Sequence, residues 1–279
     1  MNDPVTKNDA KASETPAAMT AADAVAALTQ PSRAAATAAE QSLLAKARRL
    51  EVLSAGRRLA AWIWGEQGPA VLLVHGWDSR ASHLGLFVES LLADGYRVAA
   101  FDAPAHGDSE GSHSNVVDIG RAVLEVAEQL GPLDTVVGHS VGSPACLYAF
   151  AQGLRVGASV HLAGPSSLKR VLGRFAAMCR LPDDQLTLLQ QLMAEQIGAP
   201  LDAMELENLA AGLRHPALLL HDPDDREVPF SESQILHAAW PQSVLQPMPG
   251  TGHRRIVRDN AAIEASVRFL SQQLSRRAS

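Results

Sequence analysis

The chain has 279 residues, 47% of them hydrophobic and 19% charged, which is enough to bury one large core or two small ones. Its 30 acidic residues outnumber the 24 Lys and Arg and give a net charge of -6, so it lacks a basic footprint for nucleic acid or an anionic membrane. No apolar stretch approaches the roughly 20 residues of a membrane-spanning helix, so we expect neither nucleic acid nor a membrane as a partner.

Residues 1–40 contain 14 alanines and almost no Val, Ile, Leu or aromatic residue that could anchor a core. We expect a loose or marginally helical arm outside the folded unit. The arm lacks the basic start and uninterrupted apolar run of a secretory signal, and it is not the Arg-rich, acid-poor segment of a transit peptide. It is therefore interpreted as a dispensable extension or a partner-binding tail, two readings that the sequence leaves open.

From residue 50 onward, short β-rich runs alternate with helical patterns, which is typical of a mostly parallel sheet covered on both faces. The expected strands up to residue 163 are 50–53, 58–64, 70–74, 96–101, 134–137 and 158–162. The expected helices in the same stretch are 82–93, 116–130 and 144–151. This order predicts a doubly wound α/β fold.

Between Gly164 and Arg214 the pattern becomes wholly helical, with predicted helices at 168–179, 183–196 and 202–213. Strands at 217–220 and 244–248 and helices at 231–239 and 260–274 then resume the earlier alternation. We interpret the chain as an α/β core formed by residues 41–163 and 216–279. Residues 164–215 are then a helical cap inserted into that core.

Residues 138–142, Gly-His-Ser-Val-Gly, lie between a predicted strand and a predicted helix. A glycine-x-serine-x-glycine pattern in this context forms a sharp turn that projects the serine hydroxyl at the carboxyl end of the strand. The N–H groups at the start of the following helix then face any developing oxyanion. Ser140 is the candidate nucleophile.

A serine hydroxyl is a weak nucleophile until a base removes its proton, and that base needs an acid to fix its tautomer. His253 follows the last predicted strand and is the best candidate for the base. The segment after the 217–220 strand supplies three aspartates, of which Asp225 is the preferred acid and Asp222 and Asp224 are its rivals. The resulting chain order is serine, aspartate, histidine.

These segments together resemble the α/β-hydrolase superfamily over about residues 50–275, as an esterase-like member with a serine nucleophile and a helical cap. The His-Gly-Trp sequence ending at Trp77 is similar to the family's oxyanion loop, which implies that the backbone N–H groups of Trp77 and Val141 bind the oxyanion. Residues 101–111 resemble a family segment that shapes a loop beside the site without a catalytic group. Residues 221–229 resemble the family's acid loop, and that match selects Asp225.

The sequence departs from the family pattern at Asp222 and Ala105, where the family usually has glycine, and at Ser143, where glycine is frequent. No acidic residue follows the 158–162 strand, so the acid position that some relatives use there is absent. Three further histidines match family positions that stabilise loops, and we expect scaffold roles for them: His75, His106 and His139.

The remaining histidines form neither an HExxH nor an HxH cluster, so no metal and no cofactor are implied. The two cysteines, Cys146 and Cys179, lie 33 positions apart without a CxxC pair. A disulfide framework is therefore not indicated, and the reducing cytoplasm is the expected location.

We predict a serine hydrolase that cleaves a small carboxylic ester through an acyl-enzyme intermediate, with a small-molecule acyl substrate as its partner. Leu, Met and Phe175 in the predicted cap indicate an acyl group of modest apolar character. Alternatives on the same scaffold are a thioesterase, a C–C bond hydrolase, a cofactor-free haloperoxidase and a ligand receptor without catalysis. The physiological substrate and the oligomeric state are not determined by the sequence.

Overall fold

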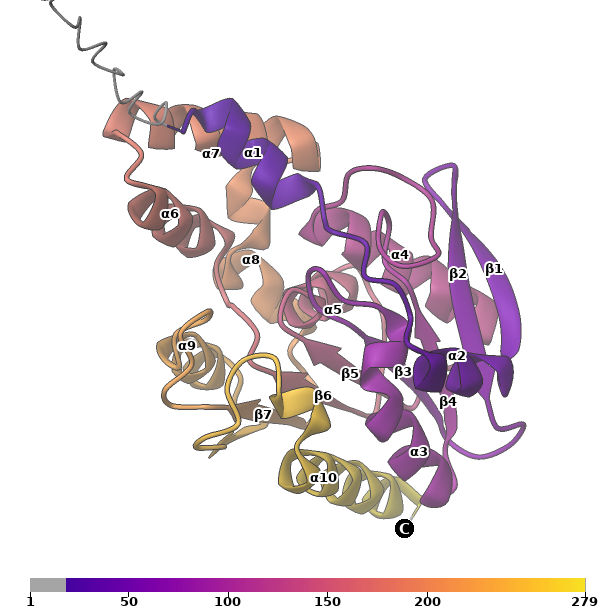
Figure 1. The fold of residues 1–279 in the computed structure, drawn as a ribbon. Helices are drawn as coiled ribbons and strands as arrows, with labels where there is room; N and C mark the ends of the chain where they lie inside the picture. The colour runs from indigo at the N-terminus through magenta and orange to yellow at the C-terminus, as the bar shows by residue number, and fades with distance from the viewer. Residues whose placement is uncertain (1–18, 279) are drawn as a thin grey trace, which may run out of the picture.

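The computed structural model describes residues 19–278, which form a central eight-stranded sheet with helices on both faces (Figure 1). The strands are β1 (Arg48–Ser54), β2 (Arg57–Trp64), β3 (Ala70–Val74), β4 (Arg97–Phe101), β5 (Thr135–His139), β6 (Ala158–Leu162), β7 (Ala217–His221) and β8 (Ser243–Pro247). Their order across the sheet is β1-β2-β4-β3-β5-β6-β7-β8. The β1/β2 and β2/β4 pairs are antiparallel, and every other pair is parallel. The predicted α/β-hydrolase architecture is confirmed.

Two apolar cores lie on the two faces of the sheet. Side chains alternate between the faces of a strand, and in β3 Leu72 and Val74 belong to one core while Val71 and Leu73 belong to the other. The strand is apolar throughout because both of its faces are buried. The helices covering the faces are α3 (Gly85–Ala93), α4 (Val116–Leu130), α5 (Gly142–Ala151) and α10 (Asn260–Ala278), with α9 (Ser231–Ala239) beside β7 and β8.

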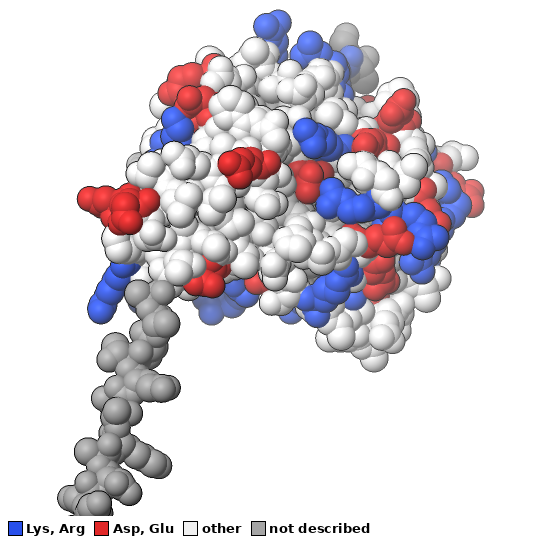
Figure 2. Space-filling model, turned by 90° about the horizontal axis from the view of Figure 1, so that it is seen from above, with Lys and Arg blue, Asp and Glu red and all other residues white. Residues whose placement is uncertain are grey.

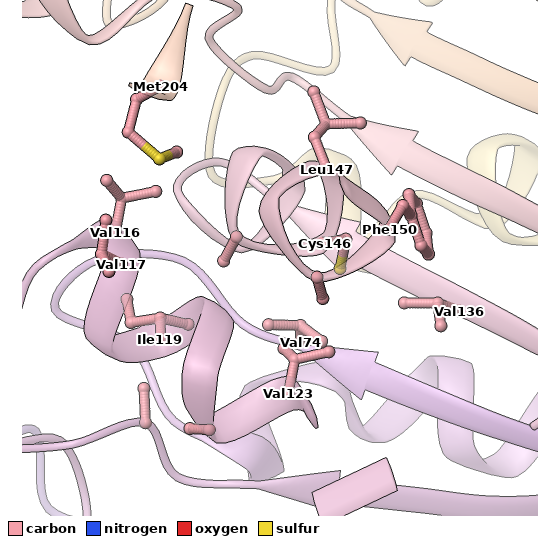
Figure 3. Close-up of a cluster of buried hydrophobic side chains, with 14 of the residues drawn as sticks. Val74, Val116, Val117, Ile119, Val123, Val136, Cys146, Leu147, Phe150 and Met204 are labelled. Carbon is pink, nitrogen blue, oxygen red and sulfur yellow. The ribbon is translucent and has the colours of Figure 1, made fainter. Parts of the chain in front are cut away.

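Helices α4 and α5 pack together on one face, and α3 and α10 pack together on the other. Figure 3 shows the first face, where Val74 of β3 lies against Val123 of α4, and Cys146 of α5 projects toward the same sheet. This packing fixes the start of α5 directly above the carboxyl end of β5. Within residues 19–278, no helix combines the length and apolarity needed to cross a membrane.

The segment between β6 and β7 is helical, but its third predicted helix is not continuous. It contains α6 (Leu168–Cys179) and α7 (Asp183–Ile197), followed by the short η2 (Leu201–Met204), α8 (Leu206–Leu209) and η3 (Ala210–Gly212). The expected helix over 202–213 is wrong because Glu205 is extended and forms a β-bridge with Ser167. We call residues 164–215 the helical insertion.

Residues 1–40 were expected to form a loose or marginally helical arm outside the folded unit, and their described part is instead helical and packed onto that unit. Thr20 and Asp23 form a capping box that starts helix α1 (Ala21–Thr29). Ala21 and Ala24 are fully buried where α1 packs along α7, because alanine lets two helices approach closely. A second helix, α2 (Ala38–Ala45), lies next to the start of α3. Residues 1–18 of the expected arm lie outside the described residues.

Candidate active site

Ser140 occupies the turn between β5 and α5 with φ 51°, a left-handed conformation that is uncommon for a residue other than glycine. The flanking glycines make this turn feasible. A Cβ on Gly138 would lie 2.9 Å from the carbonyl oxygen of Gly142, and a Cβ on Gly142 would lie 2.5 Å from that of Val74. The sequence pattern therefore produces the expected projecting serine.

The structure brings Ser140, His253 and Asp225 together at the carboxyl edge of the sheet. His253 Nε2 lies 2.9 Å from Ser140 Oγ, and His253 Nδ1 lies 2.8 Å from Asp225 Oδ2. In the arrangement that satisfies both contacts, the serine hydroxyl donates to Nε2 and the Nδ1–H group donates to the carboxylate. His253 and Asp225 are only 8% and 9% exposed, so solvent weakens these hydrogen bonds little.

The carboxylate of Asp225 is held by four donors. Its Oδ1 accepts the backbone N–H groups of Glu227 and Val228 at 2.8 and 3.0 Å. Its Oδ2 lies 3.2 Å from His221 Nε2, in addition to its contact with His253. Burial alone would raise the pKa of Asp225, but these hydrogen bonds outweigh burial and hold the pKa well below its usual range. The group therefore stays ionised beside the imidazole.

The two rival aspartates do not contact the imidazole of His253. Asp222 Oδ2 accepts the backbone N–H of Gly252 at 2.6 Å, and its Oδ1 accepts the backbone N–H of Asp224 at 3.0 Å. Asp224 itself is exposed. The geometry thus separates Asp225, which touches the His253 ring, from Asp222, which holds the loop that carries His253.

The loop after β3 places Trp77 next to the serine. A Cβ on Gly76 would lie 2.9 Å from Ser140 Cβ, so the backbone before Trp77 is in close contact with the elbow. Val141 directly precedes α5, at the positive end of that helix. In the described part of the chain, neither the Trp77 nor the Val141 N–H donates a hydrogen bond to a protein acceptor. These two N–H groups are the candidate oxyanion donors.

Three neighbouring histidines make hydrogen bonds that stabilise the site loops. His139 Nε2–H donates to the carbonyl of His253 at 2.9 Å, and burial lowers the pKa of His139 to about 3, which keeps this ring neutral. His75 Nδ1–H donates to the carbonyl of Gly76 at 2.7 Å. His106 Nδ1–H donates to the carbonyl of Pro104 at 2.9 Å.

A cavity of about 630 Å³ opens beside Ser140, and its walls are mostly apolar. The helical insertion contributes Pro165, Ser167, Leu168, Val171, Leu172, Arg174, Phe175, Ala177, Met178, Met193 and Met204 to the lining. The lining residues that sequence reasoning did not anticipate include Leu28 of α1, Asn115 and Arg226. The capping box that starts α1 was the available signal for Leu28. Among residues 19–278, no group of three or more His, Cys, Asp or Glu side chains is placed to hold a metal.

Comparisons with known proteins agree with this architecture. An esterase from Pyrococcus furiosus superposes with a TM-score of 0.69 at 20% identity, over 88% of this chain and 98% of that chain. Est1E from Butyrivibrio proteoclasticus, solved with ferulic acid bound, gives 0.62 at 17% identity over 81% and 99%. A thermophilic esterase from Thermogutta terrifontis, solved with malate bound, gives 0.60 at 19% identity over 81% and 99%. These identities show a shared fold.

A sequence model described as the alpha/beta hydrolase family matches residues 71–265. The matched stretch contains the serine elbow, the acid loop and the histidine loop described above. The chain belongs to the alpha/beta hydrolase family.

Proposed function

We propose that this protein is a serine hydrolase that cleaves a carboxylic ester through an acyl-enzyme intermediate. The observation that carries the proposal is the chain of hydrogen bonds from Ser140 through His253 to Asp225. A serine hydroxyl that already donates to a buried, oriented imidazole is primed to lose its proton to that base. The three residues come from separate loops, so the fold holds them together without help from local sequence.

In the proposed mechanism, Ser140 Oγ attacks the ester carbonyl while its proton moves to His253 Nε2. The backbone N–H groups of Trp77 and Val141 stabilise the oxyanion, and Asp225 stabilises the imidazolium. The imidazolium then gives its proton to the departing alkoxide. Water attacks the acyl-enzyme with His253 as base, and the acid leaves as Ser140 regains its proton.

The walls of the cavity favour an apolar acyl group on a small substrate. Seen from above, basic and acidic side chains are interspersed and much of the surface is uncharged, so this face offers no field of one sign for a strongly charged substrate (Figure 2). We propose that the helical insertion acts as a cap over Ser140, because α6 supplies much of the lining.

The similar esterases support an ester as substrate. The free Cys146 and Cys179 fit the reducing cytoplasm as the location.

A thioesterase, a C–C bond hydrolase and a cofactor-free haloperoxidase would use the same groups, and the shape of the cavity would distinguish them. A panel of esters, thioesters and β-diketones with matched acyl chains would separate the esterase, thioesterase and C–C hydrolase chemistries. The intact hydrogen-bond chain weighs against a receptor without catalysis, since such a protein has no need of an oriented base.

The direct test is labelling with a fluorophosphonate, which reacts only with an activated serine. We expect the wild type to be labelled and Ser140→Ala to be unlabelled, with turnover of short and medium p-nitrophenyl esters lost in the same variant. Ser112→Ala, which removes an exposed serine, is the matched control and should label normally. A wild type that is neither labelled nor active on these esters would overturn the proposal.

A further inference from the structure

The chain before β1 runs across the loops at the carboxyl edge of the sheet instead of leaving the molecule. We call residues 19–37 the N-terminal strap. It starts with α1 alongside α7 of the helical insertion and then descends over the loops at the carboxyl edge of the sheet to α2 (Figure 1). The strap thus joins the insertion to the α/β core by a route separate from the insertion's own two connections.

The upper end of the strap is fixed to the insertion and to the start of α4. The backbone N–H of Ala21 donates to Gln185 Oε1 of α7 at 3.0 Å. At the other end of α1, the carbonyl of Thr29 accepts the backbone N–H of Ser114 at 2.8 Å, and Thr29 is only 1% exposed. Ser114 is followed by Asn115 and Val116, which both line the cavity beside Ser140.

The lower end of the strap is fixed to the oxyanion loop. The backbone N–H of Ser32 donates to Asp78 Oδ1 at 2.7 Å, and Asp78 directly follows Trp77. Arg80, which is 4% exposed, donates to the carbonyl of Ala34 at 3.2 Å. Arg33 donates to the carbonyls of Gly107 and Gly111 at 2.7 and 2.6 Å. The strap is therefore anchored both to the insertion and to the loop that carries Trp77.

Between the Ala21 and Thr29 contacts of the upper end, Leu28 of α1 lines the same cavity as Ser140. It shares this wall with Val116 of α4 and with Met193 and Met204 of the insertion. Figure 3 shows Met204 with its side chain directed toward Val116. The strap thus contributes Leu28 to a cavity whose other lining residues come from the core and the insertion.

We propose that the N-terminal strap is a wall of the acyl pocket and that Leu28 sets the length of acyl chain the pocket accepts. This inference rests on the proposed ester hydrolysis and adds a specificity determinant to it. One methylene group more or less in an apolar pocket changes discrimination by about 10- to 200-fold. A bulkier side chain at position 28 should therefore exclude long chains, whereas a smaller one should admit them.

The test compares Leu28→Trp and Leu28→Ala in the full-length chain, with Ala27→Trp as the matched control on the exposed side of the same helix. We expect Leu28→Trp to lower the ratio of kcat/KM for p-nitrophenyl decanoate to that for the butyrate about tenfold or more, mainly through KM. Leu28→Ala should shift the preferred chain to longer esters. Ala27→Trp should leave the ratio within about twofold.

A second readout, the affinity for dansyl-undecanoic acid, needs no turnover. We expect about tenfold weaker binding for Leu28→Trp than for Ala27→Trp. If the wild type labels with fluorophosphonate but the Leu28 variants keep the wild-type chain-length profile and probe affinity, the strap proposal is wrong and the hydrolase proposal stands. If labelling fails but the Leu28 variants change the affinity for the probe, the hydrolase proposal is wrong and the strap proposal stands. A wild type that does not bind the probe also counts against the strap as a pocket wall.

Discussion

Asp222 accepts a hydrogen bond from the backbone N–H of Gly252 at 2.6 Å, one residue before His253. The acid loop and the histidine loop are therefore joined by a carboxylate that never touches the imidazole. Backbone N–H groups, including those of Asp224 and Gly252, lower the pKa of Asp222 despite the opposing effect of burial. The aspartate that departs from the family pattern therefore holds the loop that carries His253.

Replacing Asp225 with Asn should lower kcat by about 10³- to 10⁴-fold, because the amide cannot stabilise an imidazolium and its NH₂ group favours the wrong tautomer of His253. Asp222→Asn keeps a carbonyl oxygen that can still accept the backbone N–H of Gly252, so kcat of this variant should fall by less than about tenfold. Steady-state kinetics of the two purified variants on one ester measure both effects. A greater loss for Asp222→Asn than for Asp225→Asn would show that the acid assignment is wrong.

The serine elbow should tolerate no side chain at Gly142. A methyl group there meets the carbonyl oxygens of Val74 and His75 at 2.5 and 2.7 Å, so backbone must shift. We expect Gly142→Ala to cost about 1–3 kcal/mol in stability and, by displacing the oxyanion donors, about 100-fold in kcat. Gly173 of α6 is the control, because a methyl group there meets nothing within 4 Å. Gly173→Ala should stabilise the protein by about 0.5–1 kcal/mol in urea titrations.

Glu232 connects α9 of the core to the first helix of the insertion. The side chain of Glu232 is 2% exposed and lies 3.0 Å from Arg170 Nε and 2.7 Å from Arg174 Nη1. It also accepts the backbone N–H of Ser166 at 2.9 Å. Burial alone would raise the pKa of Glu232, but these hydrogen bonds lower it to about 2. The carboxylate is thus charged over the working pH range and holds α6 above the cavity.

Glu232→Gln should therefore destabilise the protein by about 1–3 kcal/mol and raise KM, because α6 lines the cavity and would lose its charged anchor. Asp202→Asn is the matched control, since Asp202 pairs with Lys169 of the same helix in an exposed ion pair. That control should cost less than about 1 kcal/mol. Urea unfolding and KM for one medium-chain ester measure both variants. Equal effects from the two substitutions would contradict an anchoring role for Glu232.

The sequence was sufficient for the sheet because its signals are local and strong. The buried strand β3 is continuously apolar. The glycines that flank Ser140 indicate a sharp turn that only small residues permit. The site could be predicted from the positions of Ser140, Asp225 and His253, because each follows a strand of a parallel sheet. The carboxyl ends of parallel strands meet at one edge of the sheet. Their mutual contacts then follow from the topology.

The parts that the sequence did not predict depend on contacts between distant segments. Ala21 and Ala24 are apolar but small, so their burial against α7 leaves no amphipathic pattern strong enough to distinguish a docked helix from a loose one. Glu205 has a good helix propensity, yet its extended conformation is stabilised by a bridge to Ser167, 38 residues earlier. At Glu205 tertiary pairing overrides local preference, whereas α1 keeps its local preference and only its docking on α7 is not predicted.

Buried neutral histidines should make the fold sensitive to acid. His161 of β6 is 2% exposed and lies between Ser143 Oγ at 2.8 Å and Ser159 Oγ at 3.0 Å. Burial lowers the pKa of His161 to about 3, as it does for His139. Burial raises the pKa of Asp102 to about 6. Between about pH 6 and 4 the folded state therefore binds a proton at Asp102 that the unfolded state does not bind, so Asp102 offsets part of the stability that the histidines lose in acid.

For His161, the unfolded chain binds a proton below about pH 6.5 while the folded chain stays neutral, so stability present above that pH is lost as pH falls toward 3. The slope is about 1.4 kcal/mol per pH unit, which amounts to about 2 kcal/mol between pH 6.5 and 5. Urea titrations at pH 7.5 and 5 should therefore show a loss that is smaller by about 2 kcal/mol in His161→Gln, which has no titrating ring. Both proteins keep Asp102, so its contribution cancels in this comparison. His113 is exposed, so His113→Gln is the control. If His113→Gln reduces the acid-induced loss of stability as much as His161→Gln does, burial of the histidine is not the cause of that loss.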